Sequence, residues 1–483
     1  MKAIHFIWIV FLMNTILPNL GKSQTPQDTV YHPVAPNDLN RPGYLETVYD
    51  DIYDVNITRI SDATAFGFPD GSGQLQPGYA KTQAWNADMT KVHVGFTMIL
   101  NASDYSIYKN VEDVYTQGYY NDGRWSNVDP NKRYFCWNNV FLSMDIVNEV
   151  VDTISIFSDY DDIRFGPFEG NISADDRYVV ITDINGTKAT LYDILNDNIV
   201  VTKDFGAINQ YFDWASITPS GDYIVVTNTS TGNTELYDLS FTYLRDLTTG
   251  NNQHADFAID ALGNEVLVQV IPLSMTRLSD GVTTDLISDA WVCGNYHFNP
   301  NIAGHISGRN LKNPGWALCS TQIAECSNGN GYYFRTEMFS VKLDGSGTIK
   351  PFGFAYTTCS SYDSYSKASI SPDGTKVIFS SDWNLLGSSD SNVFAYVANT
   401  ANISAVNDEN IEDKTILIVP NPANDLFEVK GEGIENVKIY DNLGRLVIST
   451  NDERIDISYL IKGYYVVIVR TKNSVFAREL LKQ

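Results

Sequence analysis

The chain has 483 residues, which is enough for one large domain and a smaller one, and its formal net charge is −25. So large an excess of carboxylates argues against a nucleic-acid partner and against docking on an anionic membrane, because both need a surface rich in Lys and Arg. The 29 Tyr and 23 Phe, with many turn-forming residues and little helical periodicity, predict an all-β fold.

Residues 1–23 have the pattern of a secretion signal peptide. A basic start is followed by an apolar run over residues 3–17 and by small residues at 21–23. The run is too short to span a membrane comfortably, and no later stretch approaches about 18 apolar residues. We therefore expect a mature chain without a transmembrane segment, which opens with an N-terminal extension over residues 24–45.

Residues 46–400 repeat a short phrase: an apolar strand, a polar turn with Asp or Gly, and a second apolar strand. The clearest copies begin at Trp214 and Ala368, and their Pro-Ser-Gly and Pro-Asp-Gly turns supply the fixed and the positive φ of a tight hairpin. Weaker copies begin at Trp85, Trp125, Asn171 and Phe257. The first five copies recur about every 40 to 46 residues, the period of propeller blades, and two hairpins per repeat give a four-stranded blade.

The repeat therefore predicts a β-propeller over residues 46–400. Six blades are visible and a seventh is expected between about residues 290 and 357, so we predict seven blades, with six or eight as alternatives. A β-helix or stacked sandwiches would also supply many short strands, but the period favours blades. The phrase Ser-Pro-Asp-Gly-Thr-Lys-Val-Ile-Phe-Ser-Ser at residues 371–381 resembles the TolB-like and WD-type propeller repeats.

The pattern changes at about residue 416, after a polar and acidic stretch, residues 401–415, that we interpret as a linker. Residues 416–483 contain a Pro-Asn-Pro opening, a Tyr-Asp-x-x-Gly-Arg hairpin, a Gly-Tyr-Tyr strand and a basic end at Lys482. In this order the motifs resemble the type A C-terminal sorting domain of the type IX secretion system. An ordinary small β-sandwich is the alternative.

The resemblance to the sorting domain implies a small β-sandwich that contacts the type IX secretion machinery. It also implies a Bacteroidota-type bacterium and passage across the outer membrane, followed by removal of the domain or by anchoring at the cell surface. We therefore expect a secreted or cell-surface protein whose specific function lies in the propeller.

Candidate site residues occur where the repeat is most disturbed. Three histidines lie there, His254, His297 and His305, and His254 and His305 are the candidates for catalysis, together with Arg309. The candidates for ligand binding are Tyr296, His297 and Trp316. Insertions in propeller blades concentrate on one face, which usually carries the site.

The stretch that starts at His305 reads His-Ile-Ser-Gly-Arg-Asn-Leu-Lys-Asn-Pro-Gly-Trp-Ala-Leu and resembles a stretch of oligogalacturonate-lyase-like propellers. The resemblance implies a polysaccharide lyase for uronate-containing glycans, with His305 or His254 as the base, Arg309 as the carboxylate clamp and Trp316 as a platform for a sugar ring. The same residues also fit structural roles in a blade. The histidines that ligate metal in these lyases have no clear counterparts here, and we predict no metal centre.

Other chemistry finds little support in the sequence. The chain has no Gly-x-Ser-x-Gly elbow, no His-Glu-x-x-His motif and no phosphate loop. Aspartate clusters could attract Ca²⁺, but no run has the spacing of a calcium loop. The mature chain keeps five cysteines, of which Cys319 and Cys326 are close enough to form one disulfide, and no Cys-x-x-Cys pair suggests zinc.

The leading hypothesis is therefore a binding or scaffold module, secreted or held at the cell surface, with an extracellular polysaccharide or protein as its partner. A polysaccharide lyase is the second hypothesis, and protein–protein recognition through the propeller face is the third. No cofactor is expected, apart from Ca²⁺ as the cation that the acidic loops could attract.

Overall fold

The computed structural model has two compact units, residues 1–400 and residues 401–483, which we describe separately. The described residues are 39–68, 75–95, 97–111, 123–206, 212–248, 254–270, 272–287, 292–293, 296–297, 304–321, 336–359, 361–384, 393–400, 416–431, 433–441, 446–471 and 475–483. Strands and turns alternate in them without an α-helix, which confirms the all-β prediction, and none forms a helix able to cross a membrane. The predicted signal peptide and linker lie outside these residues.

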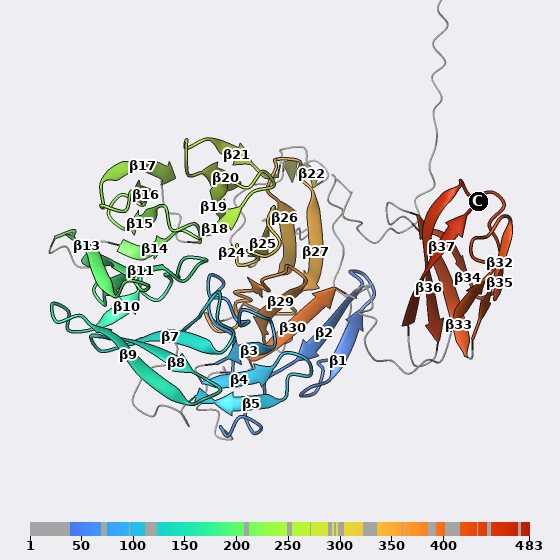
Figure 1. The fold of residues 1–483 in the computed structure, drawn as a ribbon, viewed down its shortest axis with the longest axis horizontal. Helices are drawn as coiled ribbons and strands as arrows, with labels where there is room; N and C mark the ends of the chain where they lie inside the picture. The colour runs from blue at the N-terminus through green and yellow to red at the C-terminus, as the bar shows by residue number, and fades with distance from the viewer. Residues whose placement is uncertain are drawn as a thin grey trace, which may run out of the picture. The chain divides into compact units, whose positions relative to one another are not determined.

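Eight antiparallel sheets make up the described part of the first unit. Seven of them stand around a ring as the blades of a propeller (Figure 1), and the eighth is a two-stranded hairpin. Each blade is given from its innermost strand outward. Blade 1 has β3 (Lys91–Val94), β4 (Met98–Asn101) and β5 (Ile107–Asn110). Blade 2 has β6 (Arg124–Trp125), β7 (Lys132–Trp137), β8 (Val140–Asp145) and β9 (Val150–Ile156). Blade 3 has β10 (Ile163–Phe165), β11 (Tyr178–Asp183), β12 (Lys188–Asp193) and β13 (Asn198–Asp204).

Blades 4, 5 and 6 are four-stranded sheets in chain order. Blade 4 has β14 (Phe212–Ile217), β15 (Ile224–Asn228), β16 (Thr234–Tyr237) and β17 (Tyr243–Thr248). Blade 5 has β18 (Asp256–Ile259), β19 (Glu265–Val270), β20 (Leu273–Arg277) and β21 (Thr283–Asp285). Blade 6, the one expected between about residues 290 and 357, has β24 (Gly304–Ser307), β25 (Trp316–Thr321), β26 (Glu337–Lys342) and β27 (Ile349–Phe354), and a hairpin of β22 (Val292–Cys293) and β23 (Tyr296–His297) precedes it.

Blade 7 joins the two ends of the first unit. Its inner strands are β28 (Ser369–Ile370), β29 (Lys376–Ser381) and β30 (Phe394–Thr400), and its outer strands are β2 (Val55–Arg59) and β1 (Thr47–Asp50). The β2 strand pairs with β30 over its whole length, from Val55 opposite Thr400 to Arg59 opposite Tyr396. The ring is therefore closed by hydrogen bonds between the first and the last strands of the propeller.

In blades 2, 4, 5 and 7 the repeated phrase forms the innermost strand and the turn after it. In blades 1 and 3 it forms an isolated bridge, of Trp85 with Val92 and of Ile172 with Val179, and the turn after that bridge. Five of these turns share one hydrogen bond, from an N–H with a positive φ to a carbonyl three residues earlier, and the residues that donate it are Met89, Asp176, Gly221, Gly263 and Gly374. Glycine adopts this φ without steric cost. In blades 1 and 3 a non-glycine residue takes the position, which explains why those two copies are hard to recognise.

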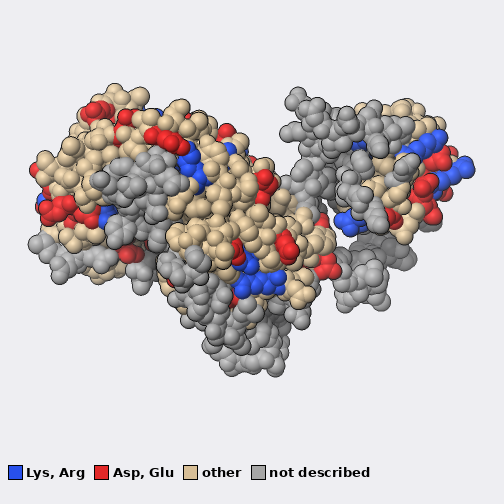
Figure 2. Space-filling model, turned by 90° about the horizontal axis from the view of Figure 1, so that it is seen from below, with Lys and Arg blue, Asp and Glu red and all other residues tan. Residues whose placement is uncertain are grey.

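Burial decreases from the centre of the ring outward. Every residue of β24 is buried, whereas exposed residues predominate in β13, an outermost strand. Cys319 is a free thiol in the core of blade 6, and burial raises its pKa to about 12. The disulfide partner that the sequence suggested, Cys326, lies outside the described residues. On the face shown in Figure 2, basic side chains occur in small groups beside acidic ones and form no continuous basic surface in the described part.

The second unit is a small sandwich of two sheets. One sheet has the order β31 (Leu417–Val419), β32 (Leu426–Lys430) and β35 (Arg454–Asp456). The other has the order β34 (Leu446–Thr450), β33 (Ile434–Asp441), β36 (Gly463–Thr471) and β37 (Val475–Lys482). Side chains from both sheets, such as Phe427 and Val467, form one apolar core between them, as predicted for a β-sandwich.

Candidate functional site

Polar and charged side chains from five blades meet at one end of the innermost strands. We call them the central cluster, which consists of Tyr79, Lys81, Glu169, His254, His305 and Lys367. His305 lies within β24, Glu169 follows β10, and the other four residues precede the innermost named strand of their blade. Because the innermost strands converge on the axis of a propeller, residues far apart in the chain come together there.

The ion pair of Lys81 and Glu169 links blades 1 and 3. Lys81 Nζ lies 2.5 Å from Glu169 Oε2 and 4.0 Å from the centre of the Trp214 ring, and the Lys81 side chain is only 1% exposed. The Trp214 indole donates to the Glu169 carbonyl at 3.1 Å, which fixes the position of the carboxylate-bearing residue. Burial raises the pKa of Glu169, and the charge of Lys81 opposes that rise.

The two histidines of the cluster lie edge to face, with ring centres 4.7 Å apart. Tyr79 stands beside both, with its hydroxyl 3.0 Å from His254 Nδ1 and its ring centre 5.2 Å from that of His305. Burial lowers the pKa of His254, and nearby Lys81 lowers it further. Burial, His254 and the two lysines hold the pKa of His305 well below its ordinary value. Both rings are therefore neutral at neutral pH.

His305 is the least satisfied polar side chain of the cluster. It is 1% exposed, and neither Nδ1 nor Nε2 has a hydrogen-bond partner among the described residues. A neutral imidazole carries one donor and one acceptor, and leaving such groups buried without a partner costs about 1–3 kcal/mol. His305 therefore has hydrogen-bonding capacity that no described residue uses.

Lys367 brings a positive charge to the cluster from blade 7. Its side chain is 6% exposed, and its Nζ lies 4.0 Å from Asp363 Oδ1 and 4.1 Å from the centre of the Tyr362 ring. Burial lowers the pKa of Lys367, and Asp363 opposes that change. Tyr362 is 61% exposed, so the cluster approaches solvent on this side.

The structure brings His254 and His305 together but gives Arg309 another contact. The Arg309 guanidinium binds Asp256 of the neighbouring blade, with Nε–Oδ2 and Nη2–Oδ1 distances of 3.0 and 2.8 Å. Asp256 is fully buried, and its Oδ2 also accepts from the N–H of Gly308 at 2.8 Å. This pair ties β18 to the segment after β24 and occupies two nitrogens of the guanidinium that the sequence suggested as a carboxylate clamp.

The predicted ligand-binding residues lie apart from the cluster or outside the described side chains. Trp316 begins β25, the second strand of blade 6, and is partly buried, with its carbonyl accepting from Asn310 at 3.0 Å. Tyr296 and His297 form β23, and their side chains lie outside the part that the structure describes.

Sequence reasoning missed the charged members of the cluster. Lys81, Glu169 and Lys367 each lie shortly before a copy of the repeated phrase. Comparing the residues that precede each copy, rather than the copies alone, would have drawn attention to them. Among the described residues, no three His, Cys, Asp or Glu side chains are placed to hold a metal ion.

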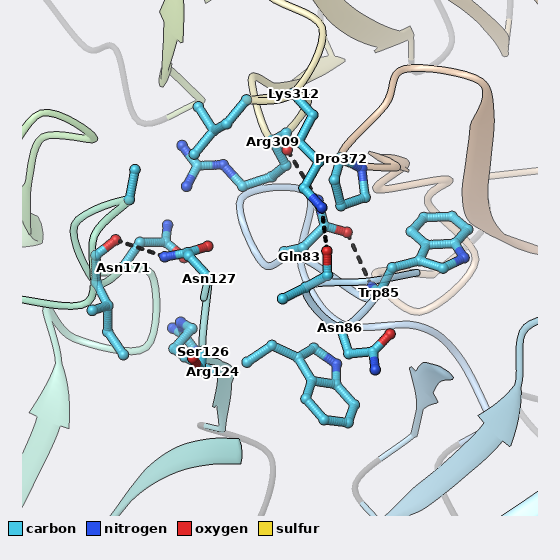
Figure 3. Close-up of a pocket in the computed structure, with 15 residues that line it drawn as sticks. Gln83, Trp85, Asn86, Arg124, Ser126, Asn127, Asn171, Arg309, Lys312 and Pro372 are labelled. Carbon is cyan, nitrogen blue, oxygen red and sulfur yellow. Dashed lines mark hydrogen bonds between the residues drawn. The ribbon is translucent and has the colours of Figure 1, made fainter. Parts of the chain in front are cut away.

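A cavity of about 240 Å³ lies at the other end of the innermost strands, where they run into their turns (Figure 3). We call it the turn-side cavity. Its lining comes from blades 1, 2, 3, 6 and 7 and includes Gln83, Asn127, Asn171, Arg309 and Lys312. The propeller therefore has two polar sites, formed by the residues before and after its innermost strands.

Comparison with known proteins shows the tail domain and the fold. Residues 417–483 match the family described as the secretion system C-terminal sorting domain, which confirms that prediction and indicates export by type IX secretion to the cell surface or beyond. No curated protein matches the sequence.

The propeller is similar to solved lyase structures. An oligogalacturonate lyase from Vibrio parahaemolyticus has 11% identity and a TM-score of 0.50, over 73% of this chain and 96% of that one. An oligogalacturonate lyase in complex with manganese has 12% identity and a TM-score of 0.51, over 73% and 95% of the two chains. At such low identity the likeness shows a shared fold.

Proposed function

We propose that the propeller is a binding module, secreted or held at the cell surface, whose central cluster takes up an acidic sugar unit of an extracellular glycan. Export would begin with cleavage of residues 1–23 in a Bacteroidota-type bacterium. The observation that supports a ligand site is the buried His305 ring, whose two nitrogens have no partner among the described residues. A ligand oxygen that accepts the ring N–H would recover much of the cost of that burial.

The charges of the cluster favour a carboxylate as the ligand group. Lys81 is already paired with Glu169 at 2.5 Å, whereas Lys367 stands 4.0 Å from Asp363, at the limit of an ion pair. A ligand carboxylate between His305 and Lys367 would gain a charge-assisted hydrogen bond from each side. Uronate units carry such a carboxylate next to hydroxyls that Tyr79 could bind.

Retention on immobilised glycans tests this function. We expect the purified protein to bind uronate-containing polysaccharides such as polygalacturonate and alginate, and to ignore neutral glucans. Lys367→Met and His305→Leu should each weaken binding about tenfold or more, since each removes a hydrogen bond to a charged group. Lys342→Met is the matched control, because this lysine is 39% exposed and pairs with Asp344 away from the cluster. Equal binding by all variants, or capture of proteins but no glycan, would contradict the proposal.

A polysaccharide lyase is the second candidate, favoured by the neutral His254 beside Tyr79. In this reaction a base removes the proton from the carbon next to the uronate carboxylate. A carbon–carbon double bond then forms, the adjacent glycosidic C–O bond breaks, and the leaving oxygen takes up a proton. His254 would be the base, and Lys367 would hold the carboxylate in the role that the sequence suggested for Arg309.

Ultraviolet absorbance of the unsaturated product separates the two candidates. If absorbance rises with polygalacturonate and is lost in both His254→Ala and His305→Ala, the protein is a lyase. Retention of the glycan without product supports the binding module.

A further inference from the structure

The turn-side cavity has the chemistry of a second ligand site, separate from the central cluster. The cations Arg124, Arg309 and Lys312 line it, and no Asp or Glu is among its described lining residues. Figure 3 shows Arg309 and Lys312 on one side of the cavity and Asn127 and Asn171 on another. The lining thus presents positive charge across from side-chain amides.

Arg309 and Lys312 each have N–H donors that no described residue accepts. Arg309 uses Nε and Nη2 for Asp256, and its Nη1 makes no hydrogen bond to a described residue. Lys312 is exposed, and its Nζ donates to one acceptor, the Ala87 carbonyl, although an ammonium group has three donors. An oxyanion in the cavity could therefore accept from both residues without breaking their present bonds.

The two asparagines offer acceptors. The amide nitrogens of Asn127 and Asn171 donate to the carbonyls of Ser173 and Lys81, both at 3.0 Å, so the amides are held in place. Their Oδ1 atoms accept no hydrogen bond from a described residue. Fixed amide oxygens opposite cationic donors suit a ligand that has hydroxyls at one end and an anionic group at the other.

We propose that the turn-side cavity binds a single acidic monosaccharide unit. Its carboxylate would lie at Arg309 and Lys312, and its hydroxyls would donate to Asn127 and Asn171. The volume of about 240 Å³ supports this size, because pockets for drug-sized ligands span roughly 300–1,000 Å³. The unit is either a free sugar acid or the end of a glycan chain.

Calorimetric titration of the full chain tests the proposal. Lys367→Met serves as the background, so that a signal from the central cluster is reduced. We expect galacturonate to bind at least about tenfold more tightly than galactose, since only the former carries the charge. Adding Lys312→Met should weaken galacturonate about tenfold and leave galactose unchanged. Adding Asn127→Leu should weaken both sugars, and adding Lys342→Met should change neither.

The outcomes separate this site from the proposed function. If galacturonate fails to bind, or binds equally well after Lys312→Met, the turn-side cavity is not an acidic-sugar site, whatever Lys367→Met does to glycan retention. Lys312 is exposed, so its substitution does not threaten the fold, and a thermal melt confirms this for each variant. Trigalacturonate distinguishes the two sources, because tighter binding than that of galacturonate indicates a chain end and weaker binding indicates a free sugar.

Discussion

Buried polar side chains on the inner strands have two different roles. Asp256 and Arg309 satisfy each other through two hydrogen bonds and hold neighbouring blades together. His305 is equally buried, yet its ring nitrogens are left without a partner among the described residues. The satisfied pair stabilises the ring, whereas His305 keeps hydrogen-bonding capacity that a ligand could use.

Acid should destabilise the propeller through His305. The unfolded residue binds a proton as the pH falls below about 6.5, whereas the folded residue, with its lowered pKa, does not. Its contribution is therefore fully present above that pH, and the free energy of unfolding falls by up to about 1.4 kcal/mol per pH unit below it, until the folded pKa is reached. Urea unfolding at several pH values between 7 and 5 measures the slope. His305→Gln should reduce it, and an unchanged slope would refute the assignment.

Removing Asp256 should cost much stability. Asp256→Asn leaves the Arg309 guanidinium buried without its ion-pair partner, and breaking a buried pair costs about 3–5 kcal/mol. Asp280→Asn is the matched control, because Asp280 pairs with the partly exposed Arg277 and its loss should change stability by less than about 1 kcal/mol. Denaturant midpoints of the two variants give the comparison. Equal midpoints would mean that the Asp256 pair does not hold the blades together.

The sequence identified the two histidines but not their surroundings. His254 and His305 attract attention because histidine is rare in this chain, with only 6 copies. Lys81 and Glu169 are ordinary surface residue types, and only the ring brings residues 88 positions apart to 2.5 Å. The ion pair of Arg309 is hidden from the sequence for the same reason, because its partner Asp256 belongs to another blade.

Side-chain hydrogen bonds support the closure of the ring where the two ends of the propeller pair. Tyr53, which follows β1, donates to Glu337 of β26 at 2.6 Å, and Tyr356 donates to Asp50 of β1 at 3.0 Å. These buried hydrogen bonds fasten the N-terminal hairpin to the chain around blades 6 and 7. The repeat could not reveal them, because β1 and β2 lie before its first copy.

Loss of one such contact should weaken the closure of the ring. Tyr53→Phe removes the hydroxyl that donates to the buried Glu337 carboxylate, and we expect the free energy of unfolding to fall by about 1–3 kcal/mol. Tyr49→Phe removes a hydroxyl that donates to Asp54 at an exposed site, and it should have little effect. Thermal melting of both variants checks the difference. The prediction fails if the two variants melt together.

At the scale of the whole molecule, the chain divides into two compact units, and the comparison with known families concerns the second. The sorting domain was predictable from sequence because its motifs are local, follow in order and lie within residues 417–483. The ligand of the propeller was not predictable, since its candidate sites combine single residues from several blades.

Removal of residues 416–483 should stop export without unfolding the propeller. We expect the truncated protein to accumulate inside the cell envelope, because the sorting domain that directs passage across the outer membrane is gone. Cell fractionation measures the location, and a melt of the purified first unit, residues 1–400, checks its fold. Normal amounts in the medium would show that the tail is not the export signal.

The pairing of β2 with β30 also determines when, during synthesis of the chain, the propeller can reach its native structure. The two strands that close the ring are far apart in sequence, since Val55 pairs with Thr400. Nearly the whole first unit must therefore be synthesised before they can pair. Contacts so distant in sequence make folding slow, since the entropy of closing a long loop is lost before the contact forms. The ring therefore cannot close before the last blade is complete, so the chain stays short of its native structure for most of its synthesis.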